Sequence, residues 1–231
     1  MEKTYPDFED STFLNAHIHD TLAFYEPRIY APEGGFYGCF LDDGTCYDPH
    51  SRHLVASTRY VLNYATAYSF YGTPKSKAWA EWGLDYLQNA HRQENGHYAW
   101  LIEKGVITDK RVMAYGHAFV LLAAASCVKA GIGRASDIME TLYDFIETYF
   151  WDETAGAYFD ERDDTLQTLS PYRGQNANMH MCEALLEAWK ATGDVSFLDR
   201  AEHLANLFAF TWPSNPMERS GSIIPKIGKS I

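Results

Sequence analysis

Three polar side chains that can bind charge or transfer a proton recur at a regular distance along the chain. Arg59, His117 and His180 each lie in a stretch with helical periodicity, where apolar residues otherwise dominate. They follow three tyrosines by 22, 19 and 22 residues, and these are Tyr37, Tyr98 and Tyr158, spaced 61 and 60 residues apart. If these stretches repeat one structural unit, the three side chains point toward the same end of the molecule. A histidine and an arginine that meet there could move a proton and stabilise a negative oxygen.

The third stretch holds the densest group of such side chains. His180 and Glu183 are three residues apart, so on a helix they share one face. A carboxylate beside an imidazole orients the ring and stabilises its protonated form, which prepares a general acid–base group. Asn176 lies four residues before His180, where its amide can bind a ligand hydroxyl.

Each of these residues also has a structural interpretation. A histidine in an apolar helix, such as His117, is typical of a hydrogen-bonded core residue, and Arg59 has many acidic residues to pair with. The shared spacing favours function. A metal site of His117, His180 and Glu183 is a weaker pattern than two histidines on one helix, so we expect no metal. The histidines without this spacing are interpreted as surface or packing residues: His17, His19, His50, His53, His91 and His203.

The elements that position these residues repeat about every sixty residues. Three glycine–aromatic segments, at 34–38, 96–100 and 156–160, predict short β-hairpins. A helical pair follows each hairpin, broken at glycine. The predicted helices are 11–26, 51–71, 75–92, 113–130, 134–150, 175–191 and 196–210. Such units must stack to bury their apolar faces, which predicts an all-α fold of helical hairpins, as an α/α barrel or an open solenoid.

Composition narrows the class of partner. A net charge of −12 over 231 residues argues against nucleic acid and against an anionic membrane surface. No apolar run approaches the ~20 residues of a membrane span, and no apolar leader is visible, so we expect a cytoplasmic protein. The four cysteines form no paired motif and are expected to be free thiols.

Several of these stretches resemble the N-acylglucosamine 2-epimerase superfamily, in particular its branch of aldose–ketose isomerases that act on mannose. The resemblance covers roughly residues 10–210, and the most specific run is 176–183. It implies an (α/α)6 barrel, a monosaccharide ligand, and neither a metal nor an organic cofactor.

The resemblance also implies residue roles. His180 corresponds to a general acid–base at the C1 and C2 carbons of the sugar, Arg59 stabilises the oxygen of the enediolate, and His117 completes the candidate catalytic group. Tyr98, Asn176 and Glu183 are the candidate substrate-binding residues. A further catalytic histidine would come from a later helix.

The resemblance also predicts an incomplete ring. Six units need roughly 360 to 400 residues, whereas this chain has 231. We expect residues 1–210 to form the first part of a barrel of about seven helices. The tail 211–231 lacks both hairpin and helical patterns. When residues 217–231 are back-translated with chosen codons and the resulting DNA is read two bases later, the new sequence resembles a segment of the family. We therefore hypothesise a frameshift in the tail. An open edge would expose apolar surface and favour self-association.

Four functions stay open at this point. The first is aldose–ketose isomerisation, mannose to fructose, and the second is 2-epimerisation of a hexose or N-acylhexosamine. The third is an inactive sugar-binding fragment. The fourth is a glycoside hydrolase, which needs two inward carboxylates, although only Glu183 is placed inward here.

Overall fold

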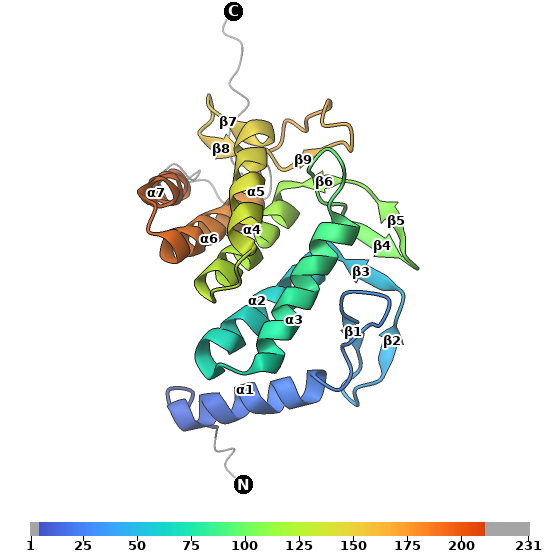
Figure 1. Ribbon diagram of the computed structural model, residues 1–231. Helices are drawn as coiled ribbons and strands as arrows, with labels where there is room; N and C mark the ends of the chain where they lie inside the picture. Colours follow the sequence, from blue (N-terminus) through green and yellow to red (C-terminus); the bar gives the residue numbers. More distant parts are fainter. Residues whose placement is uncertain (1–4, 211–231) are drawn as a thin grey trace, which may run out of the picture.

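Helical hairpins follow one another along the chain in the computed structural model, which describes residues 5–210 (Figure 1). The helices are α1 (Ser11–Tyr25), α2 (Leu54–Tyr71), α3 (Pro74–Tyr86), α4 (Ala114–Lys129), α5 (Ala135–Tyr149), α6 (Gln175–Thr192) and α7 (Val195–Phe210). Each predicted helix is confirmed with its ends shifted by a few residues at most, except that α3 passes into a π-helical turn at Leu87–His91. The predicted tail 211–231 lies outside the described residues.

Local signals set the helix ends. Gly72 ends α2 in a left-handed conformation with φ 63°, and its N–H donates to the carbonyl of Tyr68. The hydroxyl of Thr73 then accepts from the N–H of Ser76 and caps α3, whose first residue is Pro74. This turn reverses the chain within two residues and sets α3 antiparallel to α2.

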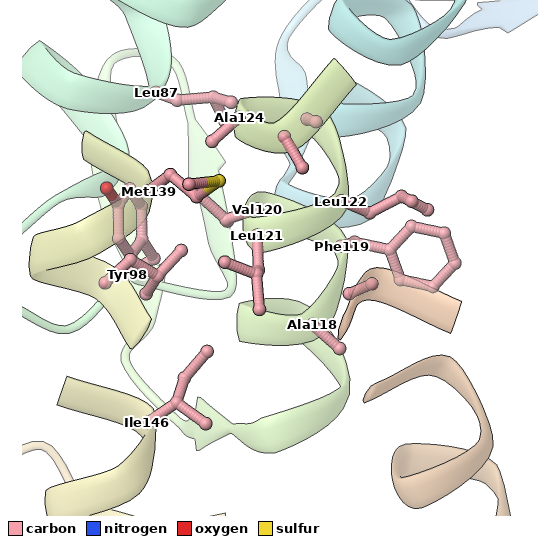
Figure 2. Packing of buried hydrophobic residues seen from close by; sticks show 14 of the residues in the cluster. Leu87, Tyr98, Ala118, Phe119, Val120, Leu121, Leu122, Ala124, Met139 and Ile146 are labelled. Atoms are coloured by element: carbon pink, nitrogen blue, oxygen red, sulfur yellow. The ribbon is translucent and has the colours of Figure 1, made fainter. Parts of the chain in front are cut away.

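The hairpins form an inner and an outer layer. The inner helices are α2, α4 and α6, and α4 packs against both of the others. Thirteen of the 16 residues of α4 are buried, so both of its sides are covered. In Figure 2, Val120 and Leu121 point toward Met139 and the outer helix α5, whereas Phe119 lies on the opposite side of α4.

Short strands join the units at the end where the inner helices begin. The strands are β1 (Cys39–Phe40), β2 (Cys46–Asp48), β3 (Ser51–His53), β4 (Leu101–Glu103), β5 (Val106–Asp109), β6 (Val112–Met113), β7 (Trp151–Asp152), β8 (Ala157–Tyr158) and β9 (Glu161–Arg162). The order β3-β4-β5 links the first unit to the second, and the antiparallel pair β6–β9 links the second to the third. This strand network fixes the starts of α2 and α4 relative to each other.

The aromatic residue that repeats between units is Phe36 in the first unit, not Tyr37 as the sequence spacing indicated. Phe36 pairs across a bridge with Tyr30, as Tyr98 does with Arg92, and all three repeating aromatics are buried. Successive residues of an extended segment face opposite sides. Tyr37 therefore points outward, where its ring lies 4.7 Å from the guanidinium of Arg52.

The arrangement is the (α/α)6-barrel type, present here as an arc of hairpins (Figure 1). α1 lies at one end of the arc and buries none of its residues. No helix among the described residues is long and apolar enough to cross a lipid bilayer.

Candidate active site

Arg59, Phe119 and His180 form a row across the three inner helices. The guanidinium of Arg59 on α2 lies 4.9 Å from the ring centre of Phe119 on α4. On the other side, the ring of Phe119 lies 4.7 Å from the ring of His180 on α6. Figure 2 shows Phe119 on the side of α4 that faces away from the outer layer. We therefore place the row on the inner face of the arc.

Arg59 has no counter-ion in the described part of the chain. It is exposed, and within residues 5–210 its contact is the cation–π interaction with Phe119 rather than an ion pair or a hydrogen bond. The chain carries 31 acidic residues against 19 basic ones, so an arginine without an acidic partner is unexpected for a structural role. Its donors are therefore available to a ligand that offers oxygen atoms.

Within residues 5–210, one ring nitrogen of His180 is hydrogen-bonded and the other has no partner. Nδ1 lies 2.8 Å from Oε2 of Glu183 and donates to that carboxylate. The ring of Tyr115 meets the ring of His180 edge-on, at 5.1 Å and 88°. With its proton held at Nδ1, neutral His180 offers the lone pair of Nε2, which suits hydroxyl binding or proton transfer.

A pocket of about 590 Å³ lies beside this row. Its walls come from α1, the loop before β1, the end of β3, α2 and the start of α4. The lining includes Tyr25, His53, Arg59, Tyr60, Asn63 and Tyr115. Burial raises the pKa of Tyr60, which is a neutral phenol at physiological pH. A cation, a carboxamide and aromatic faces in one cavity can hold a small polyhydroxylated molecule.

His117 does not join this row. Its Nδ1 donates to the carbonyl of Met113 at 2.7 Å, and its Nε2 accepts from the N–H of Tyr98 at 3.2 Å. The side chain has no exposed surface and stacks on Phe145 at 5.3 Å. Burial lowers the pKa of His117 to about 4, so the ring is neutral. With both nitrogens bonded to backbone, His117 connects its hairpin to α4 rather than facing a ligand.

The residue of the third unit that corresponds to His117 is Asn178, not His180. Oδ1 of Asn178 accepts from the N–H of Tyr158 at 2.8 Å, as His117 accepts from Tyr98. Its Nδ2 donates to the carbonyls of Tyr158 and Gly174. Because Asn178 lies two residues before His180, the predicted alignment of His117 with His180 is wrong by two residues.

The candidate binding residues separate in the same way. Tyr98 is 2% exposed, and its hydroxyl accepts from Nε2 of Gln88 at 2.6 Å, away from the row. Burial raises the pKa of Tyr98. Asn176 is exposed on the first turn of α6, one turn before His180, and Glu183 is paired with that histidine. Asn176 and Glu183 thus stay beside the row, whereas Tyr98 does not.

Tyr115 and His53 are among the pocket residues that the sequence interpretation missed. Tyr115 lies two positions before His117, and His53 was assigned to the surface or to packing. The signal for His53 was its position immediately before a helix that carries Arg59 one and a half turns later. Within residues 5–210, no three histidine, cysteine or carboxylate side chains gather as a metal would require.

The chain is similar to known proteins over most of its length. A family model described as N-acylglucosamine 2-epimerase matches residues 35–219. A D-mannose isomerase from Marinomonas mediterranea is 47% identical over 202 residues, which cover 87% of this chain and 51% of that protein. The chain thus spans about half the length of the curated relatives it matches.

Solved structures of sugar isomerases and epimerases have the same fold as this chain. A crystal structure of D-mannose isomerase superposes with a TM-score of 0.86 at 47% identity, covering 88% of this chain and 52% of the other. A cellobiose 2-epimerase from Bacillus thermoamylovorans has the same fold at 21% identity, with a TM-score of 0.80 over 89% of this chain and 58% of the other. Together with the extent of the family match, these relations show that the chain belongs to the N-acylglucosamine 2-epimerase family.

Proposed function

We propose that this chain provides one wall of a sugar isomerase that interconverts an aldose and its ketose, with mannose and fructose as the pair. The observation that carries the proposal is the row in which the unpaired guanidinium of Arg59 and the free Nε2 of His180 flank the ring of Phe119. The D-mannose isomerases that resemble the chain support the choice of sugar.

Aldose–ketose isomerisation requires a proton carrier and a group that stabilises a negative oxygen, and this row contains candidates for both. Isomerisation removes the proton on C2 beside the C1 carbonyl of the aldose, forms an enediolate, and returns a proton to C1. A histidine at near-neutral pH can accept and return that proton, and a cation stabilises the enediolate oxygen. We assign the first task to Nε2 of His180, oriented by Glu183, and the second to Arg59. Asn176 is proposed to bind a sugar hydroxyl.

A 2-epimerase is the second candidate, favoured by the family description. Epimerisation begins with removal of the same proton but returns it to the opposite face of C2. That return needs a second proton carrier on the other side of the sugar. Within the described residues, this row offers one proton carrier, the free Nε2 of His180. The row therefore supports removal of the C2 proton more directly than its inversion.

The test is incubation of this chain with D-mannose, D-fructose and N-acetylmannosamine in heavy water. Isomerase activity produces fructose from mannose with deuterium at C1, and an epimerase yields a 2-epimer with deuterium at C2. Sugar binding without deuterium exchange would support the inactive sugar-binding fragment and reject both catalytic assignments. If the chain neither binds a sugar nor exchanges deuterium, the sugar site is rejected.

We further propose that this chain associates with itself through the surface around α1. Leu14 and Ile18 of α1 are 42% and 44% exposed, and Phe70 at the end of α2 is 79% exposed. Leu14 and Ile18 are four residues apart on α1 and so share one face of that helix, and exposed apolar side chains on one face are typical of an interaction surface. Size-exclusion chromatography with light scattering should show mass rising with concentration, and Leu14→Lys with Ile18→Lys should shift the chain toward the monomer. A monomer at all concentrations would contradict this expectation.

A further inference from the structure

His53 connects a strand to a helix and is held there by one ring nitrogen. It ends β3, has extended backbone angles of φ −81° and ψ 134°, and stands at the N-cap of α2. Its Nδ1 lies 3.2 Å from the backbone nitrogen of Val55. A backbone N–H can only donate, so Nδ1 is the acceptor and carries no proton. Neutral His53 must therefore carry its proton on Nε2.

That second nitrogen is open to the pocket. His53 lines the same 590 Å³ pocket as Arg59 and Tyr115. In the described part of the chain Nε2 of His53 has no hydrogen-bond partner, and it is not one of the buried polar atoms that lack one. The ring cannot turn freely, because Trp100 packs edge-on against it at 4.5 Å and 73°. Pairing of His53 with Leu101 in the neighbouring strand fixes its backbone.

The surroundings favour the uncharged ring. Burial lowers the pKa of His53, the positive charge of Arg59 lowers it further, and the carboxylate of Asp109 opposes both. Asp109 is itself engaged by Arg111 at 2.7 Å. His53 is thus a neutral group with an N–H toward the pocket, whereas His180 holds its proton at Nδ1 and presents a lone pair.

We propose that His53 is a fixed hydrogen-bond donor of the sugar site, whose Nε2–H binds a carbonyl or alkoxide oxygen of the ligand beside the guanidinium of Arg59. The identity of the ligand as a sugar rests on the proposed function, whereas the tautomer of His53 follows from its own hydrogen bond to Val55. A neutral donor strengthens its hydrogen bond as negative charge grows on the acceptor and, unlike a cation, needs no counter-ion before the ligand arrives.

Two substitutions separate the two nitrogens. In His53→Asn the amide oxygen replaces Nδ1 and keeps the cap on Val55, because asparagine is a favourable N-cap residue. The donor at Nε2 is lost. In His53→Gln the longer side chain places an amide N–H near the former Nε2 but abandons the cap. We expect His53→Asn to keep the melting temperature and bind D-mannose roughly 5- to 10-fold more weakly. His53→Gln should melt lower and recover part of the binding.

Ring-nitrogen NMR of the unmodified chain provides the decisive measurement. Long-range ¹H–¹⁵N correlations at pH 7 should show Nε2 of His53 protonated and Nδ1 not, with the reverse for His180, and titration with D-mannose should shift Nε2 of His53. A proton on Nδ1 of His53, or mannose that shifts Arg59 and His180 but not His53, would overturn the proposal. If mannose shifts none of these groups, the sugar site is rejected, while the nitrogen shifts still decide whether His53 is a donor.

Discussion

Four histidines of this chain differ in how many of their ring nitrogens bond to other groups of the fold. His117 has both nitrogens bonded within the fold, and His91 likewise contacts the carbonyl of Ala99 at 2.9 Å and the hydroxyl of Ser57 at 3.4 Å. His180 and His53 each keep one nitrogen free. A ligand can use only the second kind. Spacing in the sequence placed His117 and His180 on inner helices, but hydrogen-bond saturation depends on contacts with distant hairpins, which spacing does not contain.

Arg59 offers a test at the scale of one residue. Because it has no ion pair within residues 5–210, Arg59→Gln should change the free energy of unfolding by less than about 0.5 kcal/mol. Sugar turnover should fall by roughly 100-fold, since a donor to the developing oxyanion is removed. Turnover is measured as deuterium incorporation, and stability by urea denaturation.

Arg200→Gln is the matched control for that substitution. Arg200 pairs with Glu147 at 2.5 Å and lies over the ring of Trp151, remote from the pocket lining. Its loss should lower stability and leave the kinetic constants of the folded protein unchanged. If Arg59→Gln instead destabilises the chain as strongly as Arg200→Gln while sparing turnover, Arg59 is a structural residue.

At the scale of elements, the sequence predicted what local patterns encode. The helices follow from apolar periodicity and from glycine breaks, so α5 and α7 appear almost where expected. The pairing of β3 with β4 was not predicted, because these strands have three residues each and come from different units. The same limit explains the shift between Phe36 and Tyr37. Adjacent aromatics look equivalent in a sequence until strand pairing decides which one faces the core.

In the third unit, the hydrogen bonds of Asn178 connect the β-hairpin to the inner helix α6, and we expect their loss to lower the free energy of unfolding. Asn178 is fully buried, and its amide bonds both backbone groups of Tyr158 and the carbonyl of Gly174. Asn178→Ala leaves three buried backbone groups without these partners and should cost about 2–4 kcal/mol of unfolding free energy. Asn178→His, which restores the side chain used by the second unit, should cost less. Urea denaturation measures both, and equal losses would argue against the correspondence with His117.

The close approach of α2 and α3 depends on Gly83. A Cβ added at this position would lie 2.6 Å from atoms of both Phe36 and Val61, so the two layers must separate to accept it. Alanine favours an isolated helix by about 1 kcal/mol, yet overpacking costs ~1–3 kcal/mol, so Gly83→Ala should be destabilising overall. Gly133→Ala, which meets no atom within 4 Å, is the control and should be close to neutral. A stabilised Gly83→Ala variant in thermal melts would show that the layers are not tightly packed there.

At the scale of the whole molecule, α4 is the element on which the site depends. Its outward side carries Val120 and Leu121 into the core with α5, while Phe119 lies on the opposite side (Figure 2). The ring of Phe119 contacts both Arg59 and His180. The same helix carries His117, which is fully buried and packs against Phe145 and Phe150. The core and the candidate site are thus two faces of one helix, and any condition that weakens packing around α4 should disturb both.

Acid should unfold this protein through its buried neutral histidines before its carboxylates titrate. Burial lowers the pKa of His91 and His117 from 6.5 to about 4, so between these values the unfolded chain binds more protons than the folded one. Stability is therefore complete above pH 6.5 and falls as the pH drops toward 4, by ~1.4 kcal/mol per residue for each unit of lowered pKa.

His117→Asn, which keeps an acceptor for Tyr98 and cannot be protonated, should reduce the slope of unfolding free energy against pH in this window. His17→Asn on exposed α1 should not. Urea denaturation at pH values from 7 to 4.5 measures these slopes, and an unchanged slope in His117→Asn would mean that His117 is not held neutral by burial.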